Sequence, residues 1–274
     1  MNKKKFEVPQ LTADELSAEL VLTNLKLAKA HERLLEEEQA RNEMFSSISH
    51  DLRSPITAIK SAVELLSNME EFTPETVTPL LQLMQNRINT LEQLINDIFL
   101  LVSLDNHCKP MKLEPVPLLF FLEDFFFSRE VDQCYKERNL SLDVPEDLDV
   151  TVMVEPHSFT RVLDNLFTNA LKYSHPGDSI CLRVTCKEDS VLISVSDTGI
   201  GIPPEDIEKV FERCYRVEKA RTPGVSSTGL GLAITRSIVR QFSGNIWCES
   251  TLGQGSTFTV SLPRIKANKE ETFC

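Results

Sequence analysis

The stretch EPHSFTRVLDNLFTNALKYS, residues 155–174, decides the fold of the second half of this 274-residue chain. It predicts a helix whose buried side consists of Leu163, Leu166, Phe167 and Ala170. Asn165 and Asn169 lie four residues apart on another face, with Lys172 close behind them. Amide oxygens suit Mg²⁺, and a lysine can neutralise phosphate oxygens. Within this segment alone, the asparagines could equally cap or solvate the helix.

A second polar group follows in SVSDTGIGIPPE, residues 194–205, where an apolar strand ends in Asp197. A buried carboxylate at a strand end can accept the exocyclic amine of adenine. Gly199 and Gly201 come directly afterwards, and glycine lets the backbone pass close under a ring. An Asp-Thr-Gly turn is common, so this segment indicates a nucleotide site only in combination with others.

The third group lies in SSTGLGLAITRSIVRQF, residues 226–242, where Gly229 and Gly231 precede an apolar helix. Backbone N–H groups at the positive end of a helix suit a di- or triphosphate. The segment does not match a Rossmann fingerprint, because the three-glycine spacing and the preceding strand are absent. The three segments in this order together indicate a nucleotide-binding domain.

A chemically reactive histidine is predicted in SSISHDLRSPI, residues 46–56. Asp51 can hold the protonated ring nitrogen of His50, which leaves the other nitrogen neutral and nucleophilic near pH 7. Pro55 removes the helical hydrogen bond to the carbonyl of Asp51 and allows a local bend. Taken alone, His50 could be an ordinary exposed histidine.

Composition excludes several classes of protein. The chain has 41% hydrophobic residues, enough for a core, and a net charge of -12, which argues against binding to nucleic acid. Seven cysteines without a Cys-x-x-Cys pair fit reduced thiols better than a disulfide framework. The longest apolar stretch, at 116–127, is too short to span a bilayer, and no signal peptide is expected.

The first third of the chain predicts two helices. Residues 12–68 contain Leu20, Leu27, Leu34 and Ile48 on a seven-residue repeat that Arg41 interrupts, so both a partial coiled coil and a solvated amphipathic helix are open. After a turn near residue 71, a second helix extends to about residue 104 with a continuous apolar stripe. A lone hairpin buries too little, so we expect a homodimer with a four-helix bundle.

The remaining chain predicts mixed strands and helices after a linker at 108–117. Strands are expected at 140–144, 150–154, 180–186, 191–197, 245–250 and 257–262, and helices at 118–138, 156–173, 204–210 and 231–242. This order indicates an α/β sandwich with one helical face. The overall fold class is therefore α+β, with a helical hairpin followed by the sandwich.

With these segments in view, the chain resembles the catalytic core of the sensor histidine protein kinases of two-component signalling over residues 46–264. The resemblance rests on a histidine box (His50), an asparagine box (Asn165, Asn169, Lys172, Tyr173), a first glycine box (Asp197, Gly199, Gly201), a phenylalanine box (211–216, with Tyr215 and Arg216) and a second glycine box (Thr228, Gly229, Leu230, Gly231). It implies a dimeric hairpin followed by an ATP-binding domain of the gyrase/Hsp90/histidine kinase/MutL type.

The resemblance also implies residue roles. Asn169 would ligate Mg²⁺ with support from Asn165, and Lys172 and Arg216 would approach the phosphates. Tyr173 would lie along the nucleoside, Asp197 would read adenine, and residues 213–228 would form a lid. Two departures are Cys214, where many relatives have an aromatic residue, and Ser54, where relatives with phosphatase activity usually have threonine or asparagine.

The expected function is ATP- and Mg²⁺-dependent autophosphorylation of His50, followed by transfer to an aspartate of a separate response-regulator receiver domain. Asp51 would orient or deprotonate His50, and the Ser54 hydroxyl could orient a water in a phosphatase reaction. Open alternatives are an ATPase of the same nucleotide fold, with Asp164 near the place of a general base, and a nucleotide-sensing dimeric adaptor. The source of the input is open: the chain could be a soluble kinase, the partner of a separate membrane or soluble sensor, or the cytoplasmic part of a membrane receptor.

The expected domains are a signalling helix at 1–45, a dimerisation and phosphotransfer domain at 46–107, a linker at 108–117, an ATP-binding domain at 118–266 and a polar tail at 267–274. The expected location is the cytoplasm, with the cytoplasmic part of a membrane sensor as the alternative.

Overall fold

The computed structural model describes residues 13–105, 111–145, 148–217 and 229–265. The chain divides into two compact units after His50. Up to His50 the described chain is a single helix, the first part of α1 (Ala13–Ser67). The predicted helix at 12–68 is confirmed, and it continues through Pro55 without a break. Leu20, Leu27 and Leu34 are exposed, so their coiled-coil role stays a prediction.

Helix α2 (Pro74–Asp105) confirms the second predicted helix and has two apolar faces. One face is buried and includes Leu94, Leu101 and Leu104. The other face remains exposed and consists of Leu81, Ile88, Ile95, Phe99 and Val102. In the described part of the chain, no helix has both the length and the apolar character that crossing a membrane requires.

The second unit also contains a mixed sheet of seven described strands in the order β1-β3-β7-β5-β4-β2, with β6 paired to β7. Their bounds are β1 (Glu114–Pro117), β2 (Asn139–Asp143), β3 (Thr151–Val154), β4 (Ser179–Cys186), β5 (Ser190–Asp197), β6 (Asn245–Thr251) and β7 (Gly255–Ile265). Among these described strands, β2 and β4 alone pair in parallel. The six predicted strands are confirmed.

Strand β1 corrects the sequence analysis, which placed residues 114–117 in a linker. The segment Glu-Pro-Val-Pro pairs with β3 at one edge of the sheet and buries only Val116. Proline is tolerated at a sheet edge because its missing N–H need not join the ladder. The prolines that indicated a linker therefore belong to an edge strand.

The described helices of this domain are α3 (Leu118–Glu130), α4 (Pro156–Lys172) and α5 (Gly231–Gln241), with short 3₁₀ turns η1 (Gln133–Tyr135), η2 (Pro204–Asp206) and η3 (Lys209–Phe211). The predicted helix at 118–138 ends earlier, because the Asp132 carboxylate accepts the N–H of Cys134 and starts a separate turn. The predicted helix at 204–210 is two 3₁₀ turns.

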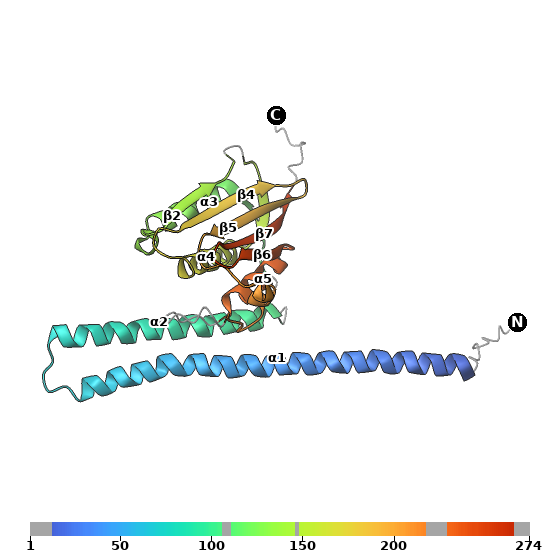
Figure 1. Cartoon of the computed structure of the whole chain (residues 1–274), viewed down its shortest axis with the longest axis horizontal. Helices are drawn as coiled ribbons and strands as arrows, with labels where there is room; N and C mark the ends of the chain where they lie inside the picture. Colours follow the sequence, from blue (N-terminus) through green and yellow to red (C-terminus); the bar gives the residue numbers. More distant parts are fainter. Residues whose placement is uncertain (1–12, 106–110, 146–147, 218–228, 266–274) are drawn as a thin grey trace, which may run out of the picture. The chain divides into compact units, whose positions relative to one another are not determined.

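The core lies between the sheet and the helices that cover one of its faces (Figure 1). Strand β5 shows why only one face is covered, since its buried residues alternate with partly exposed ones. Helix α4 faces the sheet with the buried residues Phe159, Val162, Leu163, Leu166, Phe167 and Ala170. The predicted apolar side of the helix at 156–173 is therefore confirmed.

Replacing Phe167 with alanine tests this packing. Its ring is completely buried and contacts the rings of Phe125 and Tyr135. We expect Phe167→Ala to lower the free energy of unfolding by about 3–5 kcal/mol. Urea unfolding followed by the fluorescence of Trp247, the single tryptophan, reports on this domain because Trp247 lies on β6.

The matched control is Phe120→Ala, because Phe120 is 72% exposed on α3. It should change stability by less than about 0.5 kcal/mol. Equal effects of the two substitutions would contradict the assigned core.

Candidate functional site

A cavity of about 330 Å³ lies beside α4, within the usual size range for small-molecule sites. Most of the predicted site residues line it: Asn165, Asn169, Lys172, Tyr173, Asp197, Gly201, Tyr215, Arg216, Gly229 and Gly231. Of the other predicted residues, Gly199 and Leu230 adjoin the lining residues in sequence, and Leu230 is fully buried. Thr228 and residues 218–227 of the predicted lid lie outside the described residues.

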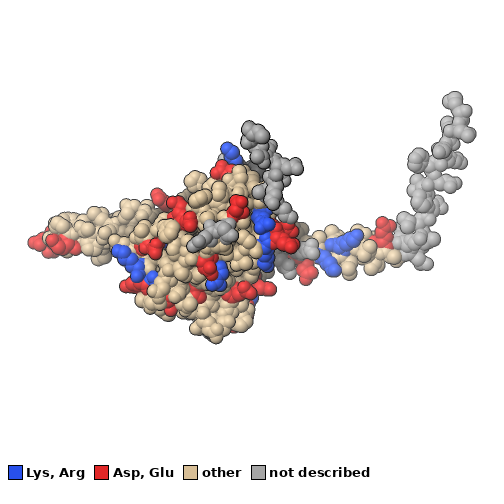
Figure 2. All heavy atoms as spheres, turned by 90° about the horizontal axis from the view of Figure 1, so that it is seen from above, with Lys and Arg blue, Asp and Glu red and all other residues tan. Residues whose placement is uncertain are grey.

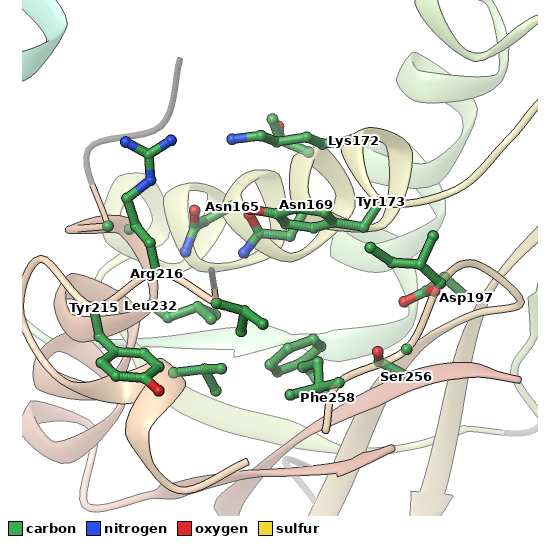
Figure 3. A pocket seen from close by; sticks show the side chains of 18 of the residues that line it. Asn165, Asn169, Lys172, Tyr173, Asp197, Tyr215, Arg216, Leu232, Ser256 and Phe258 are labelled. Atoms are coloured by element: carbon green, nitrogen blue, oxygen red, sulfur yellow. The ribbon is translucent and has the colours of Figure 1, made fainter. Parts of the chain in front are cut away.

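Helix α4 supplies one wall of the cavity. The helix begins after Glu155, whose carboxylate accepts the N–H of Ser158, and has proline at its first position. Burial of its apolar side turns Asn165 and Asn169 toward the cavity, as Figure 3 shows. Both amides therefore lie on one accessible face of the helix, as the sequence predicted.

Lys172 and Arg216 supply positive charge to the cavity from two elements. Burial, the larger cause, and the nearby Arg216 charge together lower the pKa of Lys172 to about 8. The Lys172 ammonium also lies 5.3 Å from the centre of the Tyr173 ring. A polyanion placed between Lys172 and Arg216 would relieve the repulsion between the two cations.

Asp197 lies at the other end of the cavity from Arg216 in Figure 3. The N–H of Gly199 donates to its carboxylate at 2.9 Å. Burial raises the pKa of Asp197, and backbone hydrogen bonds from Gly199 and Ser256 partly oppose that rise. The carboxylate is thus held rigidly at a strand end with acceptor capacity facing the cavity.

Two glycines after Asp197 are required by close backbone contacts. A Cβ atom on Gly199 would lie 2.1 Å from the carbonyl oxygen of Tyr173, at the end of α4. A Cβ atom on Gly201 would lie 2.2 Å from the carbonyl oxygen of Thr251, and Gly201 has a φ of +68°. These contacts tie the turn after β5 to α4 and to β6.

The phenylalanine and second glycine boxes are joined by the backbone. The N–H of Cys214 donates to the carbonyl of Gly229 at 3.0 Å, and Cys214 has a φ of 61°. The Tyr215 hydroxyl donates to Asp206 at 2.6 Å, and this hydrogen bond is the main cause that raises the pKa of Tyr215 to about 12. Tyr215 therefore stays protonated and anchored beside Arg216.

Several lining residues were missed by the sequence analysis. They include the apolar residues Ile200, Ile202, Val210, Leu232, Leu252 and Phe258, and Ser256 is one of the polar residues among them. Ser256 lies directly opposite Asp197 in the pairing of β7 with β5. Only strand register brings these two residues together, so a motif search along the chain has no signal for Ser256.

The histidine box lies on α1. His50 and Ser54 are exposed, and Asp51 is partly buried. His50 and Ser54 are four residues apart within this helix, which is one helical turn. The structure therefore keeps the predicted phosphoacceptor segment helical, with its histidine accessible to solvent.

The residues of the cavity fit a nucleotide. An anchored carboxylate lies at one end, apolar side chains form walls, and two cations with two amides lie toward the other end. A Cβ atom on Gly229 would clash with the backbone of Cys214 and Tyr215, and one on Gly231 with the side chain of Asn165, so glycine lets this segment pack against the other lining residues. The domain is thus a nucleotide-binding α/β sandwich.

Comparison with family models gives the same class. Residues 155–266 match the family described as Histidine kinase-, DNA gyrase B-, and HSP90-like ATPase, and residues 40–107 match the His Kinase A (phospho-acceptor) domain. The chain belongs to the two-component sensor histidine kinases, of which it carries the catalytic core.

Two curated relatives are similar over 82% of this chain. The sensor histidine kinase WalK of Bacillus subtilis is 36% identical over 231 residues, and the sensor protein kinase WalK of Staphylococcus aureus is 32% identical over 228 residues. The chain spans 37% and 54% of their respective lengths.

A solved structure has the same fold. The histidine kinase AdeS of Acinetobacter baumannii superposes with a TM-score of 0.62 at 22% identity, over 79% of this chain and 98% of that chain.

The lowered pKa of Lys172 makes nucleotide binding proton-linked. Near pH 8 the free Lys172 is only partly charged, and negative phosphates would raise its pKa again. We therefore expect ATP binding at pH 8 to take up a fraction of a proton. Calorimetric titrations in buffers of different ionisation enthalpy measure that uptake.

The control is Lys172→Met, which should bind ATP without this uptake because the titrating group is gone. Proton release by the wild-type chain, or equal uptake by both chains, would contradict the assignment.

Proposed function

We propose that this chain is an ATP-dependent protein histidine kinase that phosphorylates its own His50 and passes the phosphoryl group to an aspartate on a separate response regulator. The observation that carries the proposal is the polarity of the cavity: Asp197 at one end, Lys172 and Arg216 toward the other. An adenine nucleotide has a matching order of groups, a hydrogen-bond donor on the base and negative charge on the phosphates.

The nucleotide would be held along the length of the cavity. Asp197 would accept the exocyclic amine of adenine, and the neighbouring apolar side chains would pack on the ring. Tyr173 would lie along the nucleoside, and Lys172 and Arg216 would contact the phosphates. Gly229 and Gly231 line the cavity at the N-terminus of α5, where backbone N–H groups would bind phosphate.

A divalent cation fits the amide face of α4. Asn169 would hold Mg²⁺ through its side-chain oxygen with support from Asn165, since hard cations prefer oxygen ligands. When bound, Mg²⁺ supplies neutralisation of the phosphate oxygens. The chain itself contributes the orientation of the amides and exclusion of water by the apolar walls.

Phosphoryl transfer to His50 needs one free ring nitrogen. Asp51 would accept the N–H of the imidazole and keep the other nitrogen unprotonated for in-line attack on the γ-phosphate. The P–N bond forms as the bond to ADP breaks, and the ring proton is held on the Asp51 side. A phosphoramidate is reactive, so the aspartate of a receiver domain is a suitable acceptor.

A role in a phosphatase reaction is proposed for Ser54. Its hydroxyl is exposed one helical turn after His50, where it could orient a water against the phosphorylated regulator. The proposed phosphotransfer domain stays at 46–107, and the ATP-binding domain is proposed to begin at Glu114, because β1 belongs to its sheet, and to end at 266. The cytoplasm, where ATP and response regulators occur, is the proposed location.

Homodimerisation is supported by the exposed face of α2. Leu81, Ile88, Ile95 and Val102 follow one another at intervals of seven residues, and all are exposed in the single chain. An apolar seam with this period is typical of helices that pack against a second pair. We therefore propose a four-helix bundle built from two hairpins.

The ATPase alternative has less support, because its general base is engaged elsewhere. The Asp164 carboxylate pairs with Arg129 of α3 at 2.5 Å and does not line the cavity. The adaptor alternative leaves unexplained why the cavity combines phosphate-directed cations with two metal-suited amides.

Incubation with γ-labelled ATP and Mg²⁺ tests the kinase proposal. The wild-type chain should acquire acid-labile, base-stable label, and His50→Gln should acquire none because the attacking nitrogen is missing. His31→Gln is the matched control, since His31 is also an exposed histidine on α1. Its label should equal that of the wild type.

Other results of that incubation favour the alternatives. Free phosphate without labelled protein would indicate the ATPase, and nucleotide binding without any chemistry would indicate the adaptor. Label retained by His50→Gln would refute His50 as the acceptor.

The dimer proposal predicts a mass of twice 31.0 kDa for the wild-type chain by light scattering. Ile95→Glu should yield monomers, because a charge in the centre of an apolar seam is costly to bury. Asn86→Glu should remain dimeric, since Asn86 is exposed on another face of α2. Identical masses for the two variants would count against this seam.

A further inference from the structure

Asn165 is held by a residue that none of the motifs includes. Its side-chain Nδ2 donates to the Oγ1 of Thr235 at 2.7 Å. Thr235 lies on α5 and is only 1% exposed, so its hydroxyl is shielded from water and does not line the cavity. A buried hydroxyl of this kind is an efficient fixed partner because water does not compete with it.

The same contact joins α4 to the start of α5. Gly231 and Thr235 are four residues apart on α5 and therefore share a face. A Cβ atom on Gly231 would lie 2.2 Å from the Oδ1 of Asn165. The amide of Asn165 is thus confined from two sides, with its nitrogen toward Thr235 and its oxygen beside Gly231.

Fixing the nitrogen also fixes the oxygen. The two ends of an asparagine amide have nearly the same shape, so sterics alone do not choose between them. A hydrogen bond to a buried acceptor makes that choice, because only the NH₂ end can donate. The carbonyl oxygen is then the end of Asn165 that is left for a cation or for its bound water.

We infer that Thr235 is a positioning residue for the metal–nucleotide complex, acting through Asn165. This inference rests on the proposed function, in which Asn165 supports a divalent cation held by Asn169. Thr235 does not line the cavity, so it would act without touching the nucleotide itself. Its removal should therefore weaken the contribution of Mg²⁺ to nucleotide binding and leave metal-free binding unchanged.

The experiment measures binding of the β,γ-imido analogue of ATP to the full chain by calorimetry, with saturating Mg²⁺ and with EDTA. Thr235→Val keeps the side-chain shape and removes the hydroxyl. We expect its Mg²⁺-dependent gain in affinity to fall by about fivefold, the factor that corresponds to one ordinary hydrogen bond. Thr235→Ser should restore the gain because it keeps the hydroxyl.

Thr259→Val is the matched control. Thr259 is also a buried threonine, and its hydroxyl is within hydrogen-bond distance of Ser194 on β5, away from Asn165. It should keep the full Mg²⁺-dependent gain. Unfolding followed by Trp247 fluorescence should show a cooperative transition for every variant, which separates positioning from loss of the fold.

Three results would overturn the inference: an unchanged gain in Thr235→Val, an equal loss with Mg²⁺ and with EDTA, or a failure of Thr235→Ser to restore the gain. If the wild-type chain itself gains nothing from Mg²⁺, both this inference and the proposed metal site fail. The readout is binding alone, so an unlabelled His50 would refute the kinase proposal without deciding the role of Thr235.

Discussion

Burial of one side of α4 against the sheet is the constraint on which the rest of the site depends. The helix has a fully buried apolar side that includes Phe159 and Phe167. A helix that must bury that side has only one orientation about its axis, so its amides and its lysine are turned to the cavity. The hydrophobic contacts that stabilise the domain therefore also orient Asn165, Asn169 and Lys172 toward the cavity.

The opposite end of the cavity depends on backbone contacts that only glycine permits. Gly199 meets the carbonyl of Tyr173 at the end of α4, and a Cβ atom on Gly255 would lie 1.9 Å from the carbonyl oxygen of Asp197. The end of α4, the end of β5 and the start of β7 are thereby brought together. Asp197 gains its rigidity from this junction, because the neighbouring chain segments leave it no room to move.

Local patterns predicted much of this arrangement. The period of the apolar residues located α1, α2, α4 and α5, and the spacing of polar residues around Asn165 and Asp197 indicated the nucleotide site. Patterns failed where tertiary context decides the outcome. Prolines at 115 and 117 indicated a linker, yet an edge position allows them in β1. Ser256 was missed because only strand register places it beside Asp197.

Thr235 could not be predicted from local patterns either, because its hydrogen-bond partner, Asn165, lies 70 residues earlier in the chain.

The central claim is that one chain contains both the nucleotide cavity and the histidine that accepts the phosphoryl group. Tandem mass spectrometry at neutral pH, after incubation with ATP and Mg²⁺, tests it most directly by locating the added phosphate. We expect phosphate on His50, and none in Asn169→Ala. Phosphate on another residue, or on His50 of Asn169→Ala at the wild-type level, would contradict the claim.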